Sequence, residues 1–228
     1  MHKSGFVTII GNPNVGKSTF LNKIIGENIS IISKKAQTTR HRLLGILNED
    51  DFQIVFTDTP GIINTKYELQ NAMMNFVKNS LQDSDVIIYI VSNEKKDILN
   101  EAILDSIIKT KLKLFLLINK VDLMTQKEVK LALDYWERKY KPYKIFPISA
   151  LNKYNLDNFL EELKKVLPIS PPFFPKDSLT DRTLRFIISE IIREKIFKRY
   201  EKEIPYSSEV VVDEYKEKEN IVEISCII

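Results

Sequence analysis

The sequence predicts an α/β fold with a doubly wound, mostly parallel sheet of six strands. Apolar, strand-like runs alternate with helix-compatible stretches along residues 1–167, the order that produces a parallel sheet with helices on both sides. Residues 86–91 (Val-Ile-Ile-Tyr-Ile-Val) show no alternation of apolar and polar side chains, which is typical of a strand covered on both faces. Polar motifs follow the ends of several strands, where open α/β sheets bind ligands.

Each element has its own sequence pattern. We expect strands at residues 5–10, 42–48, 52–57, 85–92, 112–118 and 144–148, and helices at residues 17–26, 69–82, 98–110, 126–140 and 156–167. In the last helix, apolar residues recur at helical spacing, and this stripe indicates a face packed on the core rather than a cofactor site. The stripe consists of Leu156, Phe159, Leu160, Leu163, Val166 and Leu167.

A proline-rich stretch divides the chain. Residues 168–175 (Pro-Ile-Ser-Pro-Pro-Phe-Phe-Pro) cannot form a helix and predict a stiff connector. We therefore expect a first domain at residues 1–168, a linker at 169–178 and a second unit at 179–228. That unit begins with helical periodicity from Leu179 to Tyr200, capped by Thr180 or Asp181. Two strand-like segments follow, near residues 208–215 and 220–228.

The strand predicted at 5–10 runs directly into a phosphate-binding loop. The loop matches the pattern G-x-x-x-x-G-K-[ST] with Gly11, Asn12, Pro13, Asn14, Val15, Gly16, Lys17 and Ser18. In such a loop the backbone N–H groups and the start of the following helix face a phosphate, and glycine permits the close approach. We expect Lys17 to reach the β- and γ-phosphates and the Ser18 hydroxyl to bind Mg²⁺.

Three further motifs follow strand ends and complete a nucleotide site. They are Asp58-Thr59-Pro60-Gly61, Asn119-Lys120-Val121-Asp122 and Ser149-Ala150-Leu151. We expect Asp58 to hold Mg²⁺ through a water molecule, and the Gly61 N–H to meet the γ-phosphate. The carboxyl ends of neighbouring parallel strands meet at one edge of the sheet, so the motifs should lie together.

The last two motifs indicate which base is bound. The Asp122 carboxylate can accept both N1–H and the exocyclic amino group of guanine, whereas adenine offers neither donor there. Sites that pair a buried polar group in this way discriminate by ~10⁴ or more. Asn119 would brace the loops and the N7 edge, Lys120 would cover the ring, and the Ala150 N–H would meet O6. The sequence therefore predicts GTP and GDP as ligands.

Several stretches resemble one family closely. The chain is similar to the bacterial Era GTPases at residues 11–18, at 35–42 (Lys-Ala-Gln-Thr-Thr-Arg-His-Arg) and at 58–62. The stretch from Asp181-Arg182 through residues 203–207 (Glu-Ile-Pro-Tyr-Ser) also resembles the junction into the RNA-binding domain of that family. The resemblance implies a Ras-like P-loop GTPase domain followed by a type II KH domain, which begins helix-strand-strand. It also implies a slow GTPase that acts as a switch in small ribosomal subunit assembly.

The resemblance also implies partners and a location. The partners would be small-subunit (16S-type) ribosomal RNA and the 30S subunit, with no DNA. The location would be the cytoplasm, with peripheral association at the cytoplasmic membrane face. Other readings are a Der-like assembly factor, the G domain of a tRNA-modifying protein, and a nucleotide-sensing RNA-binding scaffold with incidental hydrolysis. The motif at 203–207 argues against the first two.

The RNA-binding clamp of a KH domain is missing from the sequence. A KH domain grips single-stranded RNA through a Gly-x-x-Gly loop, and no glycine follows Gly61. We expect an incomplete KH-like unit that binds RNA weakly, and its last strand to favour self-association. Residues 179–228 hold nine Lys/Arg against eleven Asp/Glu. The basic residues of helix 182–202 are explained equally well by surface i,i+4 pairs and by phosphate contacts.

The hydrolytic machinery departs from that of Ras. Ras-like enzymes place a Gln after the Asp-x-x-Gly glycine to orient the attacking water, and Ile62 stands there. The family pattern around Asn14 accompanies potassium-stimulated GTPases, so Asn14 is the candidate K⁺ ligand; the alternative is a hydrogen bond to its own loop. In switch I, residues 27–40, Thr39 is the candidate that closes on Mg²⁺ and the γ-phosphate, with Thr38 as the alternative.

Composition fits these expectations. The 228 residues carry a net charge of +3, which is too small to indicate an anionic partner. The single cysteine, Cys226, excludes an internal disulfide and fits a reducing compartment. Residues 1–11 do not resemble a signal peptide, and apolar runs fall far short of the ~20 residues that span a bilayer. Gln37 is a weaker candidate for orienting water, and we expect His2 and His41 to be structural or solvated.

Overall fold

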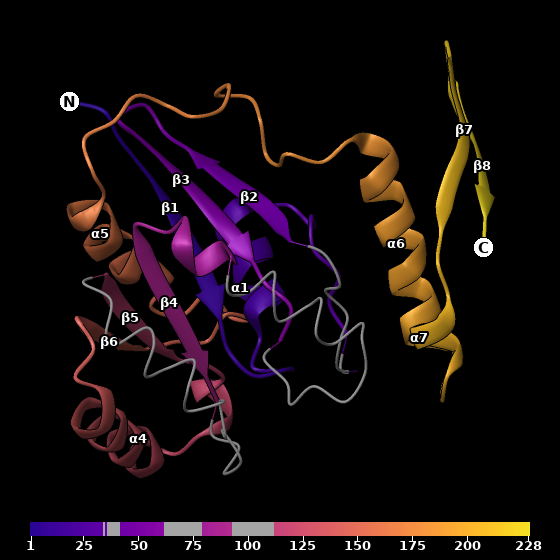
Figure 1. The fold of residues 1–228 in the computed structure, drawn as a ribbon. Helices are drawn as coiled ribbons and strands as arrows, with labels where there is room; N and C mark the ends of the chain where they lie inside the picture. The colour runs from indigo at the N-terminus through magenta and orange to yellow at the C-terminus, as the bar shows by residue number, and fades with distance from the viewer. Residues whose placement is uncertain (34, 36–41, 62–78, 93–111) are drawn as a thin grey trace.

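The computed structural model describes residues 1–33, 35, 42–61, 79–92 and 112–228. Its centre is a six-stranded sheet in the order β2-β3-β1-β4-β5-β6 (Figure 1). The strands are β1 (Lys3–Ile10), β2 (Leu43–Asn48), β3 (Phe52–Asp58), β4 (Val86–Val91), β5 (Lys113–Ile118) and β6 (Lys144–Pro147). Only β2 is antiparallel to its neighbour. The predicted mostly parallel sheet is confirmed.

In the described residues, three complete helices and one short 3₁₀ turn accompany this sheet. They are α1 (Lys17–Ile25), α4 (Gln126–Tyr140), α5 (Leu156–Val166) and η1 (Val121–Leu123). The predicted helices at 17–26, 126–140 and 156–167 are confirmed to within one residue. Of the helix predicted at 69–82, only residues 79–82 are described, and they are helical. The helix predicted at 98–110 lies outside the described residues.

The apolar core divides into layers on the two faces of the sheet. On one face, Phe159 of α5 packs edge-on against Phe20 of α1 and Phe115 of β5, with ring centroids 5.6 and 5.8 Å apart. On the other face, Trp136 of α4 meets Tyr89 of β4 edge-on at 5.8 Å. Every residue of β4 is buried, as expected of a strand covered on both faces.

The segment that follows the proline-rich stretch packs along the β2 edge of the sheet. The Ile46 N–H donates to the Leu179 carbonyl at 2.9 Å, and the Asn48 side chain donates to the Ser178 carbonyl at 2.9 Å. Asp181 accepts from the Leu44 N–H at 3.3 Å. The segment that leaves α5 can be followed over the sheet to the next helix in Figure 1. The edge of β2 is therefore covered by the chain's own backbone.

The prediction for the next helix is wrong at its start. Helix α6 spans Leu184–Arg199, and Thr183 caps it by accepting from the Phe186 N–H at 3.4 Å, so neither Thr180 nor Asp181 is the cap. The helix begins late because the Leu179 carbonyl and the Asp181 carboxylate bind the β2 backbone. Periodicity cannot reveal that competition.

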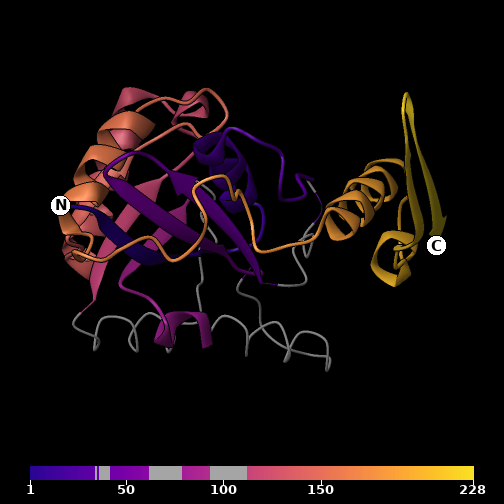
Figure 2. The same cartoon turned by 90° about the horizontal axis from the view of Figure 1, so that it is seen from above.

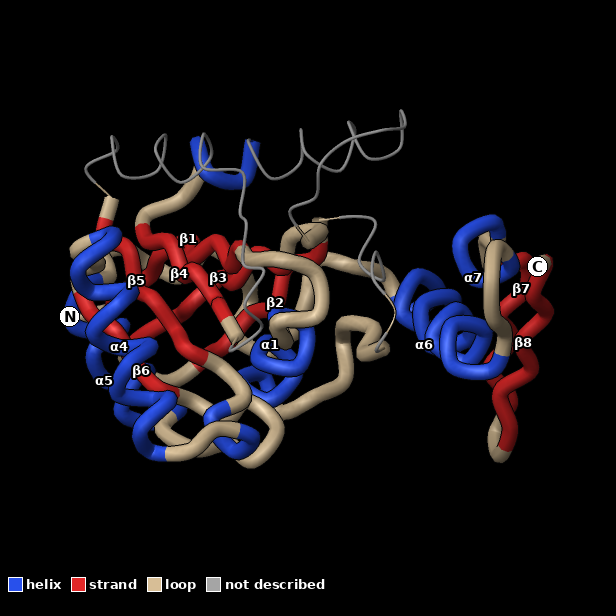
Figure 3. The backbone as a smooth tube through the Cα atoms, turned by 90° about the horizontal axis from the view of Figure 1, so that it is seen from below, coloured by secondary structure: helices blue, strands red, loops and turns tan. Residues whose placement is uncertain are grey.

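A short helix and a hairpin complete the described chain. Helix α7 (Ile204–Ser207), which was not predicted, leads to β7 (Val211–Lys218) and β8 (Ile221–Ile227), an antiparallel pair. Helix α6 lies beside the hairpin, at the end of the molecule beyond β2 (Figures 2 and 3). The helix-strand-strand order agrees with the expected start of a KH domain, while the division at 169–178 stays a prediction. No helix in the described ranges is both long and apolar enough to cross a membrane.

Candidate nucleotide-binding site

The loop between β1 and α1 has the backbone geometry that its glycines and asparagine allow. Gly16 has φ of 102° and Asn14 has φ of 65°, both in the left-handed region. A Cβ on Gly16 would lie 2.3 Å from the side-chain nitrogen of Asn119. Glycine is therefore required at this position because the guanine-recognition motif closes directly against the phosphate loop.

Lys17 is buried at the base of this loop. Its side-chain ammonium donates to the carbonyls of Gly11 at 3.0 Å and Asn12 at 2.9 Å. Burial lowers the pKa of Lys17 to about 8, and the nearby negative charge of Asp58 opposes part of that decrease. A buried cation at the end of a ring of backbone N–H groups is suited to bind phosphate oxygens.

Asp58 and two hydroxyl groups form the predicted magnesium position. The fully buried Asp58 carboxylate accepts from Ser18 Oγ at 2.9 Å and from Ser30 Oγ at 2.8 Å. Next to it, the Thr59 hydroxyl donates to the Ile9 carbonyl of β1 at 2.7 Å. Carboxylate and hydroxyl oxygens suit Mg²⁺, which often combines one or two such groups with phosphate oxygens. Ser18 and Asp58 are together as expected, whereas the sequence did not single out Ser30.

Asn119 joins its own motif, which is expected to recognise guanine, to the phosphate loop and to the Ser149-Ala150-Leu151 motif. The Asn119 amide donates to the Val15 carbonyl at 2.8 Å, and its oxygen accepts from the Ala150 N–H at 2.9 Å. From the sequence we expect the Ala150 N–H to meet guanine O6; in this structure it donates to the Asn119 side-chain oxygen instead. Asp122 is exposed at the mouth of the cavity, where a base could approach it.

The Asp-x-x-Gly motif, residues 58–61, touches the phosphate loop. A Cβ on Gly61 would lie 2.9 Å from Pro13, so the two loops touch there. Ile62 and the switch I residues Gln37, Thr38, Thr39 and His41 lie outside the described residues, and their roles stay predictions. The other histidine is structural, as expected: a ring nitrogen of His2 lies 3.1 Å from the Ser170 carbonyl.

These motifs surround one cavity of about 860 Å³. A volume of this size lies within the range of small-molecule sites, ~300–1,000 Å³. Its lining also includes Ile31, Ile32, Ser33 and Lys35, which lie in the stretch expected to be switch I, and four residues that the sequence did not single out: Thr19, Leu123, Phe197 and Lys198. Thr19 and Leu123 adjoin known motifs, but nothing in the sequence pattern indicated the last two, which belong to α6. In the described ranges, no group of three or more His, Cys, Asp or Glu side chains could hold a metal.

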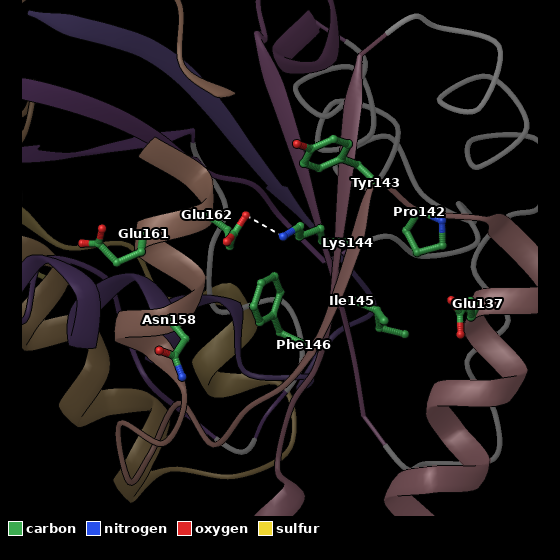
Figure 4. A pocket seen from close by; sticks show the side chains of 9 residues that line it. All are labelled: Glu137, Pro142, Tyr143, Lys144, Ile145, Phe146, Asn158, Glu161 and Glu162. Atoms are coloured by element: carbon green, nitrogen blue, oxygen red, sulfur yellow. Dashed lines mark hydrogen bonds and ion pairs between the residues drawn. The ribbon is translucent and has the colours of Figure 1, made fainter. Parts of the chain in front are cut away.

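A second cavity, of about 570 Å³, lies at the β6 edge between α4 and α5. Figure 4 shows that Lys144 of β6 points toward Glu162 of α5, and their charged groups are 2.6 Å apart. Glu162 also pairs with Lys165 at 2.7 Å, and its pKa is lowered by hydrogen bonds from both lysines. None of the residues that line this cavity belongs to a nucleotide motif, so it is not part of the candidate site.

Comparison with known proteins identifies the family. A model of the 50S ribosome-binding GTPase family matches residues 6–120. A similar structure is the crystal structure of Era in complex with MgGDPNP and nucleotides 1506–1542 of 16S ribosomal RNA. Its sequence is 38% identical to this chain, and the two structures superpose with a TM-score of 0.92. The alignment covers 99% of this chain and 78% of that one. The chain belongs to the Era GTPase family.

Two other structures share the fold, and the first of them also belongs to Era. Era from Aquifex aeolicus, in a variant bound to GDP and AlF₄⁻, is 38% identical over 98% of this chain and 78% of its own, with a TM-score of 0.90. The FeoB G-domain from Methanococcus jannaschii is 23% identical over 72% of this chain and 97% of its own, with a TM-score of 0.55, and shows the shared fold alone. As an Era-family member, the chain is a GTPase that binds guanine nucleotides with a Ras-like P-loop fold.

Proposed function

We propose that this chain is a GTP-dependent switch in assembly of the small ribosomal subunit, with 16S-type ribosomal RNA and the 30S subunit as partners. One observation carries the proposal. The Era structure that aligns with 99% of this chain holds both a GTP analogue and a segment of 16S ribosomal RNA. The two ligands that the proposal needs are therefore bound together by a protein with the same fold over nearly the whole of this chain.

The nucleotide would be held by the residues already described. Lys17 and the N–H groups of the phosphate loop would bind the phosphate chain, and Asp122 would bind the guanine edge. Ser18 and Asp58, with Thr39 of switch I, would hold Mg²⁺, which supplies positive charge opposite the phosphates. Asn119 keeps the loops aligned, because its side chain joins the Val15 carbonyl to the Ala150 N–H.

Potassium is the proposed source of the charge that speeds hydrolysis. Ile62 cannot orient water, so hydrolysis by this chain alone should be slow. The Asn14 side chain is exposed and lines the nucleotide cavity, so an ion bound beside the phosphates could reach it. This position supports the K⁺ ligand over the alternative of a loop-bonded asparagine.

The α6 helix and the β7–β8 hairpin form the proposed RNA-binding unit. Its basic residues do not all stand free: Arg193 pairs with Glu190 at 2.7 Å, and Lys198 pairs with Glu194. This pairing supports the surface-pair reading of the helix, and we expect RNA binding to be weak and to fall steeply with salt. We also propose a cytoplasmic location with peripheral membrane association, on the family resemblance alone.

Turnover with and without RNA tests the proposal. We would measure phosphate release from GTP by the 228-residue chain alone, with an RNA of 16S nucleotides 1506–1542, and with 30S subunits. We would also measure binding to 30S subunits in the presence of GDP and of GDPNP. A switch predicts slow hydrolysis alone and 30S binding that differs between GDP and GDPNP. Equal 30S binding in both nucleotide states would contradict a switch and favour the scaffold reading.

A further inference from the structure

Helix α6 contributes part of the wall of the nucleotide cavity. Phe197 and Lys198 line it together with the phosphate loop, although they lie about 180 residues farther along the chain. The Phe197 side chain is fully buried, and its ring meets Tyr206 of α7 edge-on at 5.7 Å. The helix is therefore packed in place at this point, and Lys198 stands beside the cavity on a fixed support.

Two contacts attach α6 to the segment that lines the same wall. The Glu194 carboxylate accepts from the Ile32 N–H at 3.5 Å. The Lys35 ammonium donates to the Tyr200 carbonyl at the end of the helix. Since Ile32 and Lys35 line the cavity too, this wall is made jointly by switch I and α6.

The wall lies at the phosphate and metal end of the cavity. Ser30 directly precedes the switch I residues that line the wall. Its hydroxyl donates to the Asp58 carboxylate, which also accepts a hydrogen bond from the Ser18 hydroxyl. Asp122, Leu123 and Leu151 line the same cavity, and the base would lie beside Asp122. Ile32 and Lys35, which contact α6, follow Ser30 closely in the chain, so we expect this part of α6 to border the phosphate chain.

The charges of the cavity lining as a whole favour an anionic ligand. The lining contains four lysines, Lys17, Lys35, Lys120 and Lys198, against one carboxylate, Asp122. Lys198 pairs with Glu194, and half of its side chain is exposed, which leaves the ammonium room to turn toward the cavity. GTP with Mg²⁺ retains net negative charge, and a nearby ammonium would be attracted to it.

We propose that Lys198 is a nucleotide-binding residue, which adds positive charge from α6 at the phosphate end of the guanine nucleotide. The inference rests on the proposed nucleotide site and extends it to a helix beyond the GTPase sheet. The γ-phosphate adds negative charge at that end, so Lys198 should favour GTP over GDP. Because its side chain is partly exposed, salt should weaken the effect.

Nucleotide titration of charge variants tests this role. We would titrate the full chain with fluorescent (mant-labelled) GDPNP and GDP, in Mg²⁺ buffer at low salt. Loss of one partly exposed ion pair should weaken GDPNP binding about threefold in Lys198→Ala, and charge reversal about tenfold in Lys198→Glu. In both variants the loss of affinity for GDP should be smaller than the loss for GDPNP. Lys198→Arg should retain the wild-type affinity for both nucleotides. Lys195→Glu makes the same charge change at an exposed position of α6 that does not line the cavity.

A second variant separates a direct contact from a positioning effect. If Lys198 acted only by keeping Glu194 against the Ile32 N–H, Glu194→Ala, which removes that acceptor, would weaken GDPNP binding as much as Lys198→Ala. A direct role predicts the opposite: Glu194→Ala releases the Lys198 ammonium, so GDPNP affinity should stay the same or rise. Parallel losses in the two variants would overturn the proposal.

The outcomes also distinguish this inference from the proposed function. If the wild-type chain bound neither nucleotide, the nucleotide site itself would be wrong. If the wild-type chain bound both, and Lys198→Glu matched Lys195→Glu for both nucleotides, only the role of Lys198 would fail. Circular dichroism melts of each variant would verify that α6 remains folded.

Discussion

The side-chain amide of Gln53 holds the backbone of Phe174 through both of its polar atoms. Gln53 Oε1 accepts from the Phe174 N–H at 3.0 Å, and Nε2 donates to the Phe174 carbonyl at 2.8 Å. The same oxygen accepts from the Phe173 N–H at 2.7 Å. Gln53 lies on β3 and is completely buried, so one polar side chain inside the sheet layer attaches the proline-rich connector to the GTPase domain.

Replacing Gln53 should therefore weaken the connector's attachment. Gln53→Leu keeps similar bulk but leaves the Phe173 and Phe174 backbone groups without their partner, which should cost about 1–3 kcal/mol of unfolding free energy. Urea denaturation followed by fluorescence would measure it. Gln126→Leu, at an exposed position at the start of α4, is the matched control and should change little. Equal stability of the two variants would show that the connector is not held by Gln53.

The lowered pKa of Lys17 predicts a pH-dependent stability of the nucleotide-free protein. Its folded-state pKa is about 8, below the unfolded value near ~10.4. Between these values the unfolded state binds more protons, so this group's contribution to stability rises with pH. Below about pH 8 the buried charge of Lys17 lowers the free energy of unfolding. Lys17→Met removes this charge and should therefore raise the free energy of unfolding at pH 7 by about 1–2 kcal/mol, even though two hydrogen bonds are lost.

Urea denaturation at pH 7, 8.5 and 10 would check this window. The advantage of Lys17→Met should shrink as the pH rises from 8 toward 10. Lys23→Met, on the same helix, should show no such advantage at pH 7. A Lys17→Met variant less stable than wild type at pH 7 would contradict a destabilising buried charge.

Nucleotide binding should take up protons above pH 8. Phosphate favours the charged ammonium and should raise the pKa of Lys17 from about 8, so the free protein must gain a proton when it binds. Affinity for GDP should fall as the pH rises from 8 to 9. Isothermal titration calorimetry at pH 8.5 in two buffers of different ionisation enthalpy would give the uptake, about half a proton or more. Zero uptake would mean that Lys17 is already charged in the free protein.

Asp122→Asn should change which base is preferred. The amide presents a donor where guanine's N2 amino group needs an acceptor, and it matches the C2 carbonyl of xanthine. GTP affinity should fall by ~10²-fold or more, while xanthosine triphosphate gains affinity. Competition titrations of both nucleotides would measure the change, with Asp134→Asn on the exposed surface of α4 as control. Unchanged GTP affinity would refute the role given to Asp122.

Asn14 should confer the response to potassium. Hydrolysis by the intact chain should be faster in K⁺ than in Na⁺, and removal of the Asn14 side chain should abolish the difference. Because Asn14 has φ of 65°, Asn14→Gly is a cleaner deletion than Asn14→Ala, which adds backbone strain. Phosphate release at equal ionic strength would decide it. Equal rates for the wild-type chain in both salts would exclude the K⁺ role.

The sequence alone determined the sheet and the local parts of the nucleotide site. Strand and helix periods follow from which face of an element is buried, so β4 and α5 could be predicted from apolar spacing. The phosphate loop could also be predicted, because Gly16, Lys17 and Ser18 act through the backbone of their own strand-loop-helix unit.

Only the tertiary structure decided what joins distant segments. Gln53 of β3 holds the connector, Ser30 donates to Asp58, and Lys198 of α6 lines the nucleotide cavity. Each of these relationships brings together segments that are far apart in the chain. A polar side chain has the same local pattern whether it faces water or a partner brought near by folding. The late start of α6 has the same cause, because the β2 edge competes for Leu179 and Asp181 with hydrogen bonds that no local propensity encodes.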